Sequence, residues 1–307
     1  MKKIAVVGSS NIDMIIKSSR LPKPGETVGD GIFAKANGGK GANQAVAAAR
    51  AGGNVVFISC LGNDDFAHTM LNDFKNGKID TQFVFIEDKE PTGIALILVD
   101  NSGENCISVA PGANHKLSVE HIKKAETIIK ESEIILLQLE IPVESVLFAI
   151  ELAHKHKKKV LLNPAPARQI DDKHLAMIHS LVLNETEAEF LTGLPVRTDS
   201  QIREAAKALM EKGSQNIVIT LGAKGAFVKN SERDEFLPGF KVEAVDTTAA
   251  GDVYCGNLAV ALVEGKSIFE AVRFASAASA ISVTRLGAQP SAPKLTETIE
   301  FLKTHSL

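Results

Sequence analysis

The residues best suited to chemistry lie at 246–252, which read Asp-Thr-Thr-Ala-Ala-Gly-Asp and lead into a small-residue stretch that predicts a helix. Ala249, Ala250 and Gly251 carry little side-chain bulk, so backbone N–H groups can converge on an anion where the helix dipole is positive. Asp252 would repel that anion, unless it accepts the proton of an attacking hydroxyl during phosphoryl transfer. We predict an anion hole over these four residues with Asp252 as the catalytic base. The alternative is that Asp252 only complements the helix dipole.

A glycine-rich stretch, NGGKGANQA at 37–45, opens another predicted helix. Gly38, Gly39 and Gly41 permit close backbone approach, and Lys40 places a cation at the helix N-terminus, which favours phosphate or polyol binding. The stretch matches neither GxxxxGK[ST] nor GxGxxG, so a Rossmann dinucleotide enzyme is disfavoured. A purely structural role for the glycines is the alternative.

Polar residues also follow several apolar runs. Asn11 and Asp13 come after the first run, and an acceptor carboxylate beside an amide suits adjacent sugar hydroxyls, although an Asx turn or helix cap explains them equally well. Glu140 and Asn163 end two consecutive runs, where solvation at the rim of a sheet explains either one alone.

Residues 184–187 have the form of a capping box, Asn-x-x-Glu, at the start of a helix. Glu187 is also a candidate to hold Mg²⁺ through water, because this ion commonly binds proteins through one or two carboxylates.

The elements that position these residues follow from the hydrophobic pattern. Continuous apolar runs predict parallel strands buried on both faces, at 3–8, 54–62, 133–140, 159–166, 180–185 and 216–222. Amphipathic stretches between them predict helices at 40–52, 64–76, 118–131, 143–157, 186–193, 199–213, 251–264 and 267–284. This alternation predicts an α/β fold, a three-layer αβα domain with a mostly parallel central sheet whose carboxyl edge binds ligands.

Two segments, at about 14–35 and 92–109, interrupt that alternation and resemble antiparallel strands, the second with a hairpin about Asn101, Ser102 and Gly103. We interpret them as a small β-sheet lid inserted into a single domain spanning 1–307.

Composition narrows the class of protein. The 307 residues carry 34 Lys plus Arg against 37 Asp plus Glu, a net charge of −3, so no basic field indicates nucleic-acid binding. Cys60, Cys106 and Cys255 are widely separated and form no CxxC pair, which indicates neither a disulfide framework nor a zinc site. The first apolar run stops after Val7, too short for a signal peptide or membrane span. We expect a cytoplasmic protein that does not enter a membrane.

Taken together, these motifs resemble the ribokinase-like family of carbohydrate kinases over the whole chain. The matching segments are VVGSSNID, NGGKGANQA, PGAN, LLQLEIP, NPAPA, NETEAE, TLGAKG, DTTAAGD and RLGAQPS. The resemblance implies ATP-dependent phosphorylation of the 5-hydroxyl of D-ribose to D-ribose 5-phosphate, with Mg²⁺ as the partner of the nucleotide and K⁺ as activator.

The resemblance also implies a set of roles, with Asp252 as the base. The sugar-binding positions are Asn11, Asp13, Gly39, Lys40, Asn43, Glu140 and Asp252. The ATP-binding positions are Asn184, Thr220, Leu221, Gly222, Ala223, Lys224, Gly225, Gly251, Asp252 and Ser276. The K⁺ positions are Asp246, Thr248, Ser282, Arg285, Gly287 and Ser291. A helix C-terminus would explain Arg285 and Gly287 without any ion.

A lid with free edges and an apolar face invites a second copy, so we expect a homodimer, as the resemblance also implies. Two alternatives stay open. One is a kinase for another substrate, such as fructose, a nucleoside or a sugar phosphate, although residues 92–109 contain no Lys, Arg or aromatic residue to favour the last two. The other is a catalytically silent sugar- or nucleotide-binding regulator, against which the presence of Asp252 argues.

Overall fold

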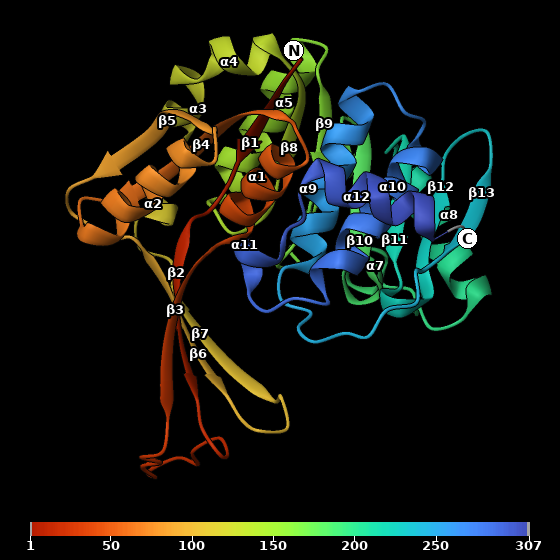
Figure 1. Ribbon diagram of the computed structural model, residues 1–307. Coiled ribbons are helices and arrows are strands. Elements are labelled where there is room, and N and C mark those ends of the chain that lie inside the picture. Colours follow the sequence, from red (N-terminus) through yellow and green to blue (C-terminus); the bar gives the residue numbers. More distant parts are fainter. Residues whose placement is uncertain (1, 306–307) are drawn as a thin grey trace.

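The computed structural model describes residues 2–305, so the ends of the expected domain, residue 1 and residues 306–307, lie outside it. Two sheets organise these residues: a nine-stranded central sheet and a four-stranded sheet that projects from one end of the body (Figure 1). Helices lie on both faces of the central sheet. The expected α/β architecture with a separate small sheet is therefore confirmed.

The central sheet has the order β13-β12-β11-β10-β9-β8-β1-β4-β5. Seven strands are parallel, and β12 and β13 add an antiparallel hairpin at one edge. The strands are β1 (Lys3–Val7), β4 (Asn54–Gly62), β5 (Asp80–Glu87), β8 (Ser132–Leu137), β9 (Lys159–Leu162), β10 (Ser180–Asn184), β11 (Asn216–Thr220), β12 (Gly225–Lys229) and β13 (Asp234–Pro238).

Alternate residues of each central strand enter two separate cores. In β1, Ala5 and Val7 pack into one core, and Ile4 and Val6 pack into the other. This double burial explains why the strands read as continuous apolar runs. The first core is covered by α3 (Val119–Lys124), α4 (Glu126–Glu131), α5 (Val143–Lys155), α6 (Asp172–Leu175), α7 (Glu185–Thr192) and α8 (Asp199–Glu211). The second is covered by α1 (Lys40–Arg50), α2 (Asp65–Asn76), α9 (Ala250–Val263), α10 (Ile268–Ser282) and α12 (Leu295–Thr304), with α11 (Ala288–Ser291) beside α1.

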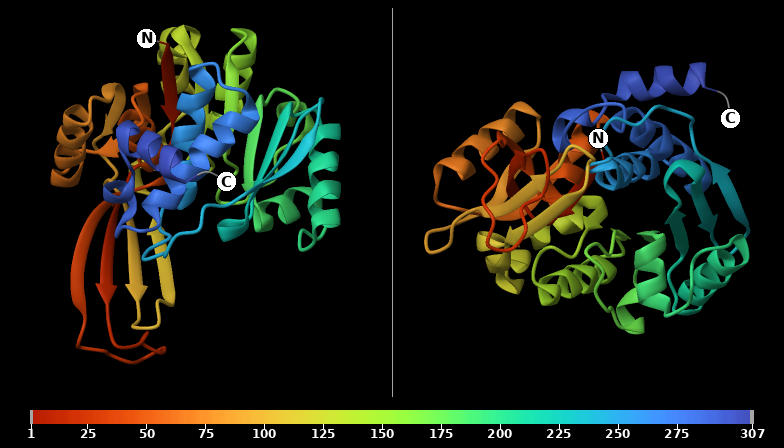
Figure 2. Two further views of the ribbon diagram at one scale, coloured as in Figure 1. Left: turned by 45° about the vertical axis from the view of Figure 1, so that its right-hand side comes forward. Right: turned by 90° about the horizontal axis from the view of Figure 1, so that it is seen from below.

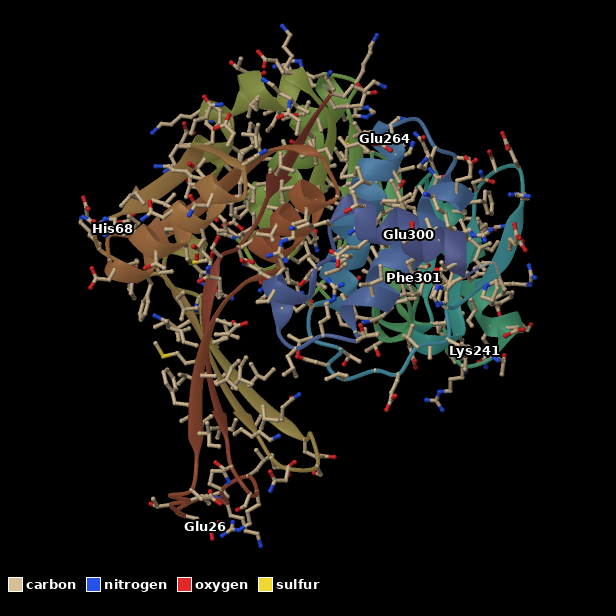
Figure 3. The ribbon with its side chains drawn as sticks, viewed as in Figure 1. Glu26, His68, Lys241, Glu264, Glu300 and Phe301 are labelled. Atoms are coloured by element: carbon tan, nitrogen blue, oxygen red, sulfur yellow. The ribbon has the colours of Figure 1, made fainter. Side chains whose placement is uncertain are left out.

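The lid contains β2 (Asn11–Lys17), β3 (Ile32–Gly38), β6 (Gly93–Val99) and β7 (Asn105–Ala110), in the order β3-β2-β6-β7. Figure 2 shows these strands leaving the body side by side. Glu26, in the connection between β2 and β3, lies at the far tip of the lid (Figure 3). Because β1 continues into β2 through Ser9 and Ser10, the lid begins at the carboxyl edge of the central sheet.

Several boundaries differ from expectation. The lid strands extend to Asn11 and Gly38, closer to the body than 14–35, and β2 pairs with β6 in parallel although both hairpins are antiparallel as expected. The expected strand at 133–140 ends at Leu137, because the N–H of Leu139 turns to bond the carbonyl of Ala165.

The expected helix at 118–131 is two helices. Ala125 separates them with φ −90° and ψ 5°, and the change of direction lets Ile122 and Ile129 enter the same core. Separately, none of the helices within residues 2–305 combines the length and apolarity needed to cross a bilayer.

Candidate active site

The candidate site lies where the strand order changes direction. From β1 the chain builds the sheet one way through β4 and β5, and then the other way from β8 through β11. Ligands of open α/β sheets bind at the carboxyl ends of strands at such a point. A cavity of about 230 Å³ lies here, lined by Lys40, Asn163, Ala165, Val182, Leu183, Asn184, Glu187, Thr220, Thr247, Ala249, Ala250, Gly251, Asp252, Tyr254 and Cys255.

Asp252, in the first turn of α9, is buried but lines this cavity. Its Oδ2 accepts a hydrogen bond of 3.1 Å from Nδ2 of Asn43, and its Oδ1 accepts one of 3.0 Å from Nε2 of Gln44. Burial raises the pKa of the Asp252 carboxyl, while the charge of Lys40 and the two amide donors act in the opposite direction. Both oxygens are thus held by N–H donors from α1.

The N-terminus of α1 approaches the β1–β2 connection closely. Gly39 has φ 87°, and a Cβ atom at Gly41 would lie 2.5 Å from the backbone of Gly8 and Ser9. This contact explains the glycines of the 37–45 motif, since any side chain there would push α1 away. It also brings Lys40 and Asn43 beside the start of the lid.

Glu140, just after β8, anchors that helix start. Its Oε2 accepts hydrogen bonds from the backbone N–H of Lys40 at 3.0 Å and from Oγ of Ser9 at 2.6 Å. Lys40 is partly buried, and its pKa is raised chiefly by the charge of Asp252, with further contributions from Glu140 and Glu187. Lys40 is therefore the cation that partly offsets a group of carboxylates.

Asn11 and Asp13 lie on strand β2 beside the site. They are therefore part of neither a helix cap nor an Asx turn, the two alternatives that their sequence also allowed. Asn114 fixes Asn11: Nδ2 of Asn114 donates to Oδ1 of Asn11 at 2.8 Å and to the carbonyl of Ser10 at 3.0 Å. The pKa of Asp13 is raised to about 6, first by burial and then by the charges of Glu140 and Asp252. Asp13 therefore belongs to the same electrostatic cluster as the base.

The anion hole differs in detail from the sequence expectation. Ala249 adopts the left-handed conformation with φ 57° at the N-cap of α9, and the N–H of Ala250 donates to the carbonyl of Thr247 at 3.2 Å. The first intrahelical bond runs from Val253 to Ala249, so Gly251 and Asp252 precede it. Of the four predicted N–H groups, that of Ala250 is used within the turn, while those of Ala249, Gly251 and Asp252 have no backbone partner among the described residues. Their assignment to an anion stays a prediction.

The expected capping box is present at the other end of the cavity. Oε2 of Glu187 accepts from the N–H of Asn184 at 2.9 Å, and Oδ1 of Asn184 accepts from the N–H of Glu187 at 2.8 Å. Burial raises the pKa of Glu187, which lines the cavity. Thr220 lies beside these residues, with its Oγ1 donating to the carbonyl of Leu183 at 3.1 Å.

Other predicted nucleotide positions lie outside the cavity wall. Leu221 to Gly225 form the turn between β11 and β12, which includes the short 3₁₀ helix η2 (Gly222–Lys224), and Ser276 lies on α10. Their assignment to ATP remains a prediction.

The expected cation loops meet at Asp246. Its Oδ1 accepts from the N–H of Thr248 at 2.9 Å, and its Oδ2 accepts from the N–H of Gly287 at 2.8 Å. The side chain of Arg285 forms an ion pair of 2.6 Å with Glu297 on α12. The hydroxyls of Ser282 and Ser291 donate to the carbonyls of Ser279 and Ala288. These two hydroxyl oxygens retain lone pairs for a cation.

Sequence reasoning missed three residues of this site. Gln44 and Gln138 are fully buried and connect Asp252 to β8, while Tyr254 lines the cavity. Gln44 lies inside the glycine-rich motif. A neutral glutamine among the alanines of a predicted helix gives no indication of a functional role. Asn163 was attributed to rim solvation, whereas its Oδ1 accepts a hydrogen bond of 3.3 Å from Gln44.

Comparison with known proteins identifies the family of this chain. Residues 1–295 match the pfkB family of carbohydrate kinases. The chain is 47% identical to the ribokinase of Haemophilus influenzae, covering 98% of this chain and 99% of that one. It is 40% identical to the deoxyribokinase of Salmonella typhi, covering 97% and 98%. The structure of Arabidopsis thaliana ribokinase complexed with ribose and ATP superposes with a TM-score of 0.92 at 33% identity, covering 99% of both chains. The chain therefore belongs to the pfkB family of carbohydrate kinases.

Proposed function

We propose that the protein transfers the γ-phosphoryl group of ATP to the 5-hydroxyl of D-ribose, giving D-ribose 5-phosphate and ADP. The observation that carries this proposal is the position of Asp252. Its carboxylate is buried, accepts hydrogen bonds from two amides and lies in the first turn of α9. A carboxylate next to a phosphate site repels the ligand, so its presence there is best explained if it accepts a proton during the reaction.

In the proposed reaction the 5-oxygen of ribose attacks the γ-phosphorus while the bond from that phosphorus to the bridging oxygen of ADP breaks. Asp252 accepts the proton of the hydroxyl and later releases it to solvent. The N–H groups of Gly251 and Asp252 face the equatorial oxygens of the transferring group. Alignment and charge neutralisation, rather than covalent participation of the protein, supply the rate enhancement.

The sugar is assigned to the lid side of Asp252, where the cluster offers hydroxyl acceptors. Asp13 and Glu140 are such acceptors, and Lys40 and Asn43 are donors from α1. Since Oε2 of Glu140 already holds the helix start, Oε1 is the oxygen available to a sugar hydroxyl. The lid, whose β2 carries Asp13, would exclude water from the transfer and so suppress ATP hydrolysis.

The nucleotide is assigned to the opposite side, along Asn184, Thr220 and the 221–225 turn, with Ser276 beyond it. Glu187 fits a role toward Mg²⁺, because it lines the cavity and its capping box uses only Oε2. Mg²⁺ bound with the nucleotide would supply positive charge against the β- and γ-phosphate oxygens. Within residues 2–305 there is no cluster of three His, Cys, Asp or Glu side chains that could hold a metal.

K⁺ is assigned to the two loops joined by Asp246. The donor set fits a large monovalent ion, since it combines one carboxylate with hydroxyl and backbone oxygens of Thr248, Ser282, Arg285, Gly287 and Ser291. The N-terminus of α9 begins four residues after Asp246. Ordering of this loop would therefore order the anion hole.

The lid supports the proposed homodimer, because both of its faces expose large apolar side chains. These are Ile16, Ile32, Phe33, Leu96, Ile107 and Val109.

The three cysteines are free thiols, which fits the reducing cytoplasm to which we assign the enzyme.

A second candidate substrate is 2-deoxy-D-ribose, because a deoxyribokinase is among the relatives reported above. ADP release measured with ATP and each of D-ribose, 2-deoxyribose, fructose and a nucleoside tests both candidates. The proposal expects the highest kcat/KM with D-ribose and little ADP without sugar. Preference for 2-deoxyribose would select the second candidate. Absence of turnover with every sugar would favour a silent binding protein instead.

A further inference from the structure

A chain of buried amides ends on the carboxylate of Asp252. Nε2 of Gln44 donates to Oδ1 of Asp252 at 3.0 Å, and Oε1 of Gln44 accepts from Nε2 of Gln138 at 2.6 Å. Gln44 is 0% exposed and Gln138 is 1% exposed. The two glutamines come from α1 and from the residue following β8, so the chain ties the base on α9 to two other elements.

Only one orientation of these amides satisfies their surroundings. An ionised carboxylate accepts hydrogen bonds only, so Gln44 must present its NH₂ group to Asp252 and its oxygen to Gln138. Asn163 agrees with this orientation, because its Nδ2 donates to the carbonyl of Val182 and its Oδ1 faces Nε2 of Gln44. An ionised Asp252 therefore requires this direction of the amide hydrogen bonds, and this direction in turn favours the ionised form of Asp252.

Gln138 is held by close packing on its other side. A Cβ atom at Gly8 would lie 2.0 Å from Oε1 of Gln138, so that oxygen lies against the backbone of β1's carboxyl end, and it has no hydrogen-bond partner in the structure. This packing keeps the amide of Gln138 in place, with its Nε2 directed at Oε1 of Gln44.

From this geometry we infer that Gln44 is a positioning residue for Asp252, and that Gln138 holds Gln44 in its donating orientation. The inference rests on the proposed function, in which Asp252 is the base. Gln44 fixes the carboxylate plane through Oδ1 while Asn43 holds Oδ2, so the carboxylate is oriented before the sugar arrives. The N–H of Gln44 also favours the ionised form that can accept a proton.

The charged groups around Asp252 make its ionised form depend on the hydrogen bond from Gln44. Within residues 2–305, Lys40 on α1 is the one cation among the charged groups that act on Asp252. Glu140 after β8, Asp13 on β2 and Glu187 on α7 are acids, and the thiol of Cys255 lies on α9 itself. Loss of one hydrogen-bond donor to a carboxylate in acidic surroundings shifts the balance toward the protonated, inactive form.

The test is the rate of phosphoryl transfer in a single turnover, measured from pH 5 to pH 9 for Gln44→Met and Gln44→Glu. We expect the acidic limb of the rate to move upward by roughly half a pH unit or more for Gln44→Met, and further for Gln44→Glu, which adds a like charge. The rate at neutral pH should fall about 10-fold to 100-fold, with a much smaller change in the KM for ribose. Gln138→Met should move the limb in the same direction by less.

Asn257→Leu is the matched control. Asn257 is also a buried amide, on α9 itself, and its Nδ2 donates only to the carbonyl of Val253. This variant should lower stability without moving the acidic limb. An acidic limb unchanged in both Gln44 variants, or moved equally by Asn257→Leu, would overturn the inference. If Gln44→Met fails to fold, Gln138→Met decides by the same criterion.

Failure of the inference is separable from failure of the proposed function. If Asp252→Asn transfers phosphate at a near-normal rate, Asp252 is not the base and the proposed mechanism fails. If Asp252→Asn is inactive while the Gln44 variants keep the wild-type pH profile, only the positioning role fails.

Discussion

The backbone N–H of Gly287 donates a hydrogen bond of 2.8 Å to Oδ2 of Asp246, which lies 41 residues earlier in the chain. The other carboxylate oxygen accepts from Thr248, two residues from Asp246 itself. Burial opposes the charge of Asp246, but hydrogen bonds from Thr248 and Gly287 outweigh it and lower the pKa of this carboxyl. One ionised side chain thus joins the loop before α9 to the loop after α10, so an ion between the loops would act on the anion hole.

The first prediction concerns that ion. Replacing K⁺ by tetramethylammonium at equal ionic strength should lower kcat, because the loop that leads into the anion hole loses the ion that orders it. Asp246→Ala should show a low rate in either salt, because the loops lose their common acceptor. Asp171→Asn, which removes the charge of a helix-capping carboxylate outside the cavity, should retain the response to K⁺. Equal rates of wild type in both salts would refute the cation site.

The second prediction concerns sugar selectivity. Asp13→Ala should raise the KM for ribose by about 10-fold to 100-fold, since a charged hydrogen-bond partner is lost, and should shrink the preference for ribose over 2-deoxyribose. The KM for ATP should hardly change, because the nucleotide is assigned to the 184 and 220–225 segments. The measurement is kcat/KM for both sugars and for ATP. A change confined to ATP would move the sugar site away from β2.

The third prediction concerns pH. Because the pKa of Asp13 is raised to about 6 from its ordinary value of 3.8, the folded protein binds this proton more tightly than the unfolded chain. Ionisation of Asp13 therefore costs stability as pH rises between these two values, and the penalty is complete above pH 6.

Asp13→Asn removes that penalty. Its free energy of unfolding relative to wild type should increase on going from pH 4 to pH 7, by on the order of 2 kcal/mol. Urea unfolding at several pH values measures the difference. A difference that does not vary with pH would show that Asp13 titrates normally.

The central fold could be predicted because the pattern of double burial is local. Parallel strands such as β1 and β10 are continuous apolar runs, and helices such as α8 have a regular amphipathic period with a capping box at Thr198. The hairpin of β12 and β13 was missed, since the buried apolar run of β12 is only three residues long, Ala226 to Val228, and β13 is mostly half-buried and mixes charged with apolar types. Likewise, the break at Ala125 has no proline or glycine to mark it.

The site was predictable where a motif carried its residues and not where tertiary contact defined them. Lys40 and Asp252 come from distinctive stretches, and the structure places both in the cavity wall. The amide chain through Gln44 and Gln138 depends on a contact between residues 94 positions apart. Similarly, Asn114 holds Asn11 across 103 positions. Neither relationship has a local pattern in the sequence.

The fourth prediction concerns assembly. Phe33 and Ile107 are more than half exposed on the lid, and strand register puts them on opposite faces of the sheet, with Phe33 beside Ile16 and Ile107 in line with Ile15. The double variant Phe33→Asp and Ile107→Asp should be monomeric where wild type is dimeric. Glu26→Gln, at the lid tip (Figure 3), is the control and should leave the dimer intact. Light scattering distinguishes the species, and a monomeric wild type would refute lid-mediated dimerisation.

The central claim is that Asp252 removes the proton of a sugar hydroxyl during phosphoryl transfer from ATP. The most direct measurement is the single-turnover rate of D-ribose 5-phosphate formation by Asp252→Asn and by wild type, with ribose and ATP affinities determined by calorimetry on the same preparations. Asparagine keeps the shape of the side chain but cannot accept the proton. We predict that the variant binds both ligands and that its rate falls by roughly 10²-fold to 10⁴-fold. A rate close to that of wild type, with both ligands bound, would contradict the claim.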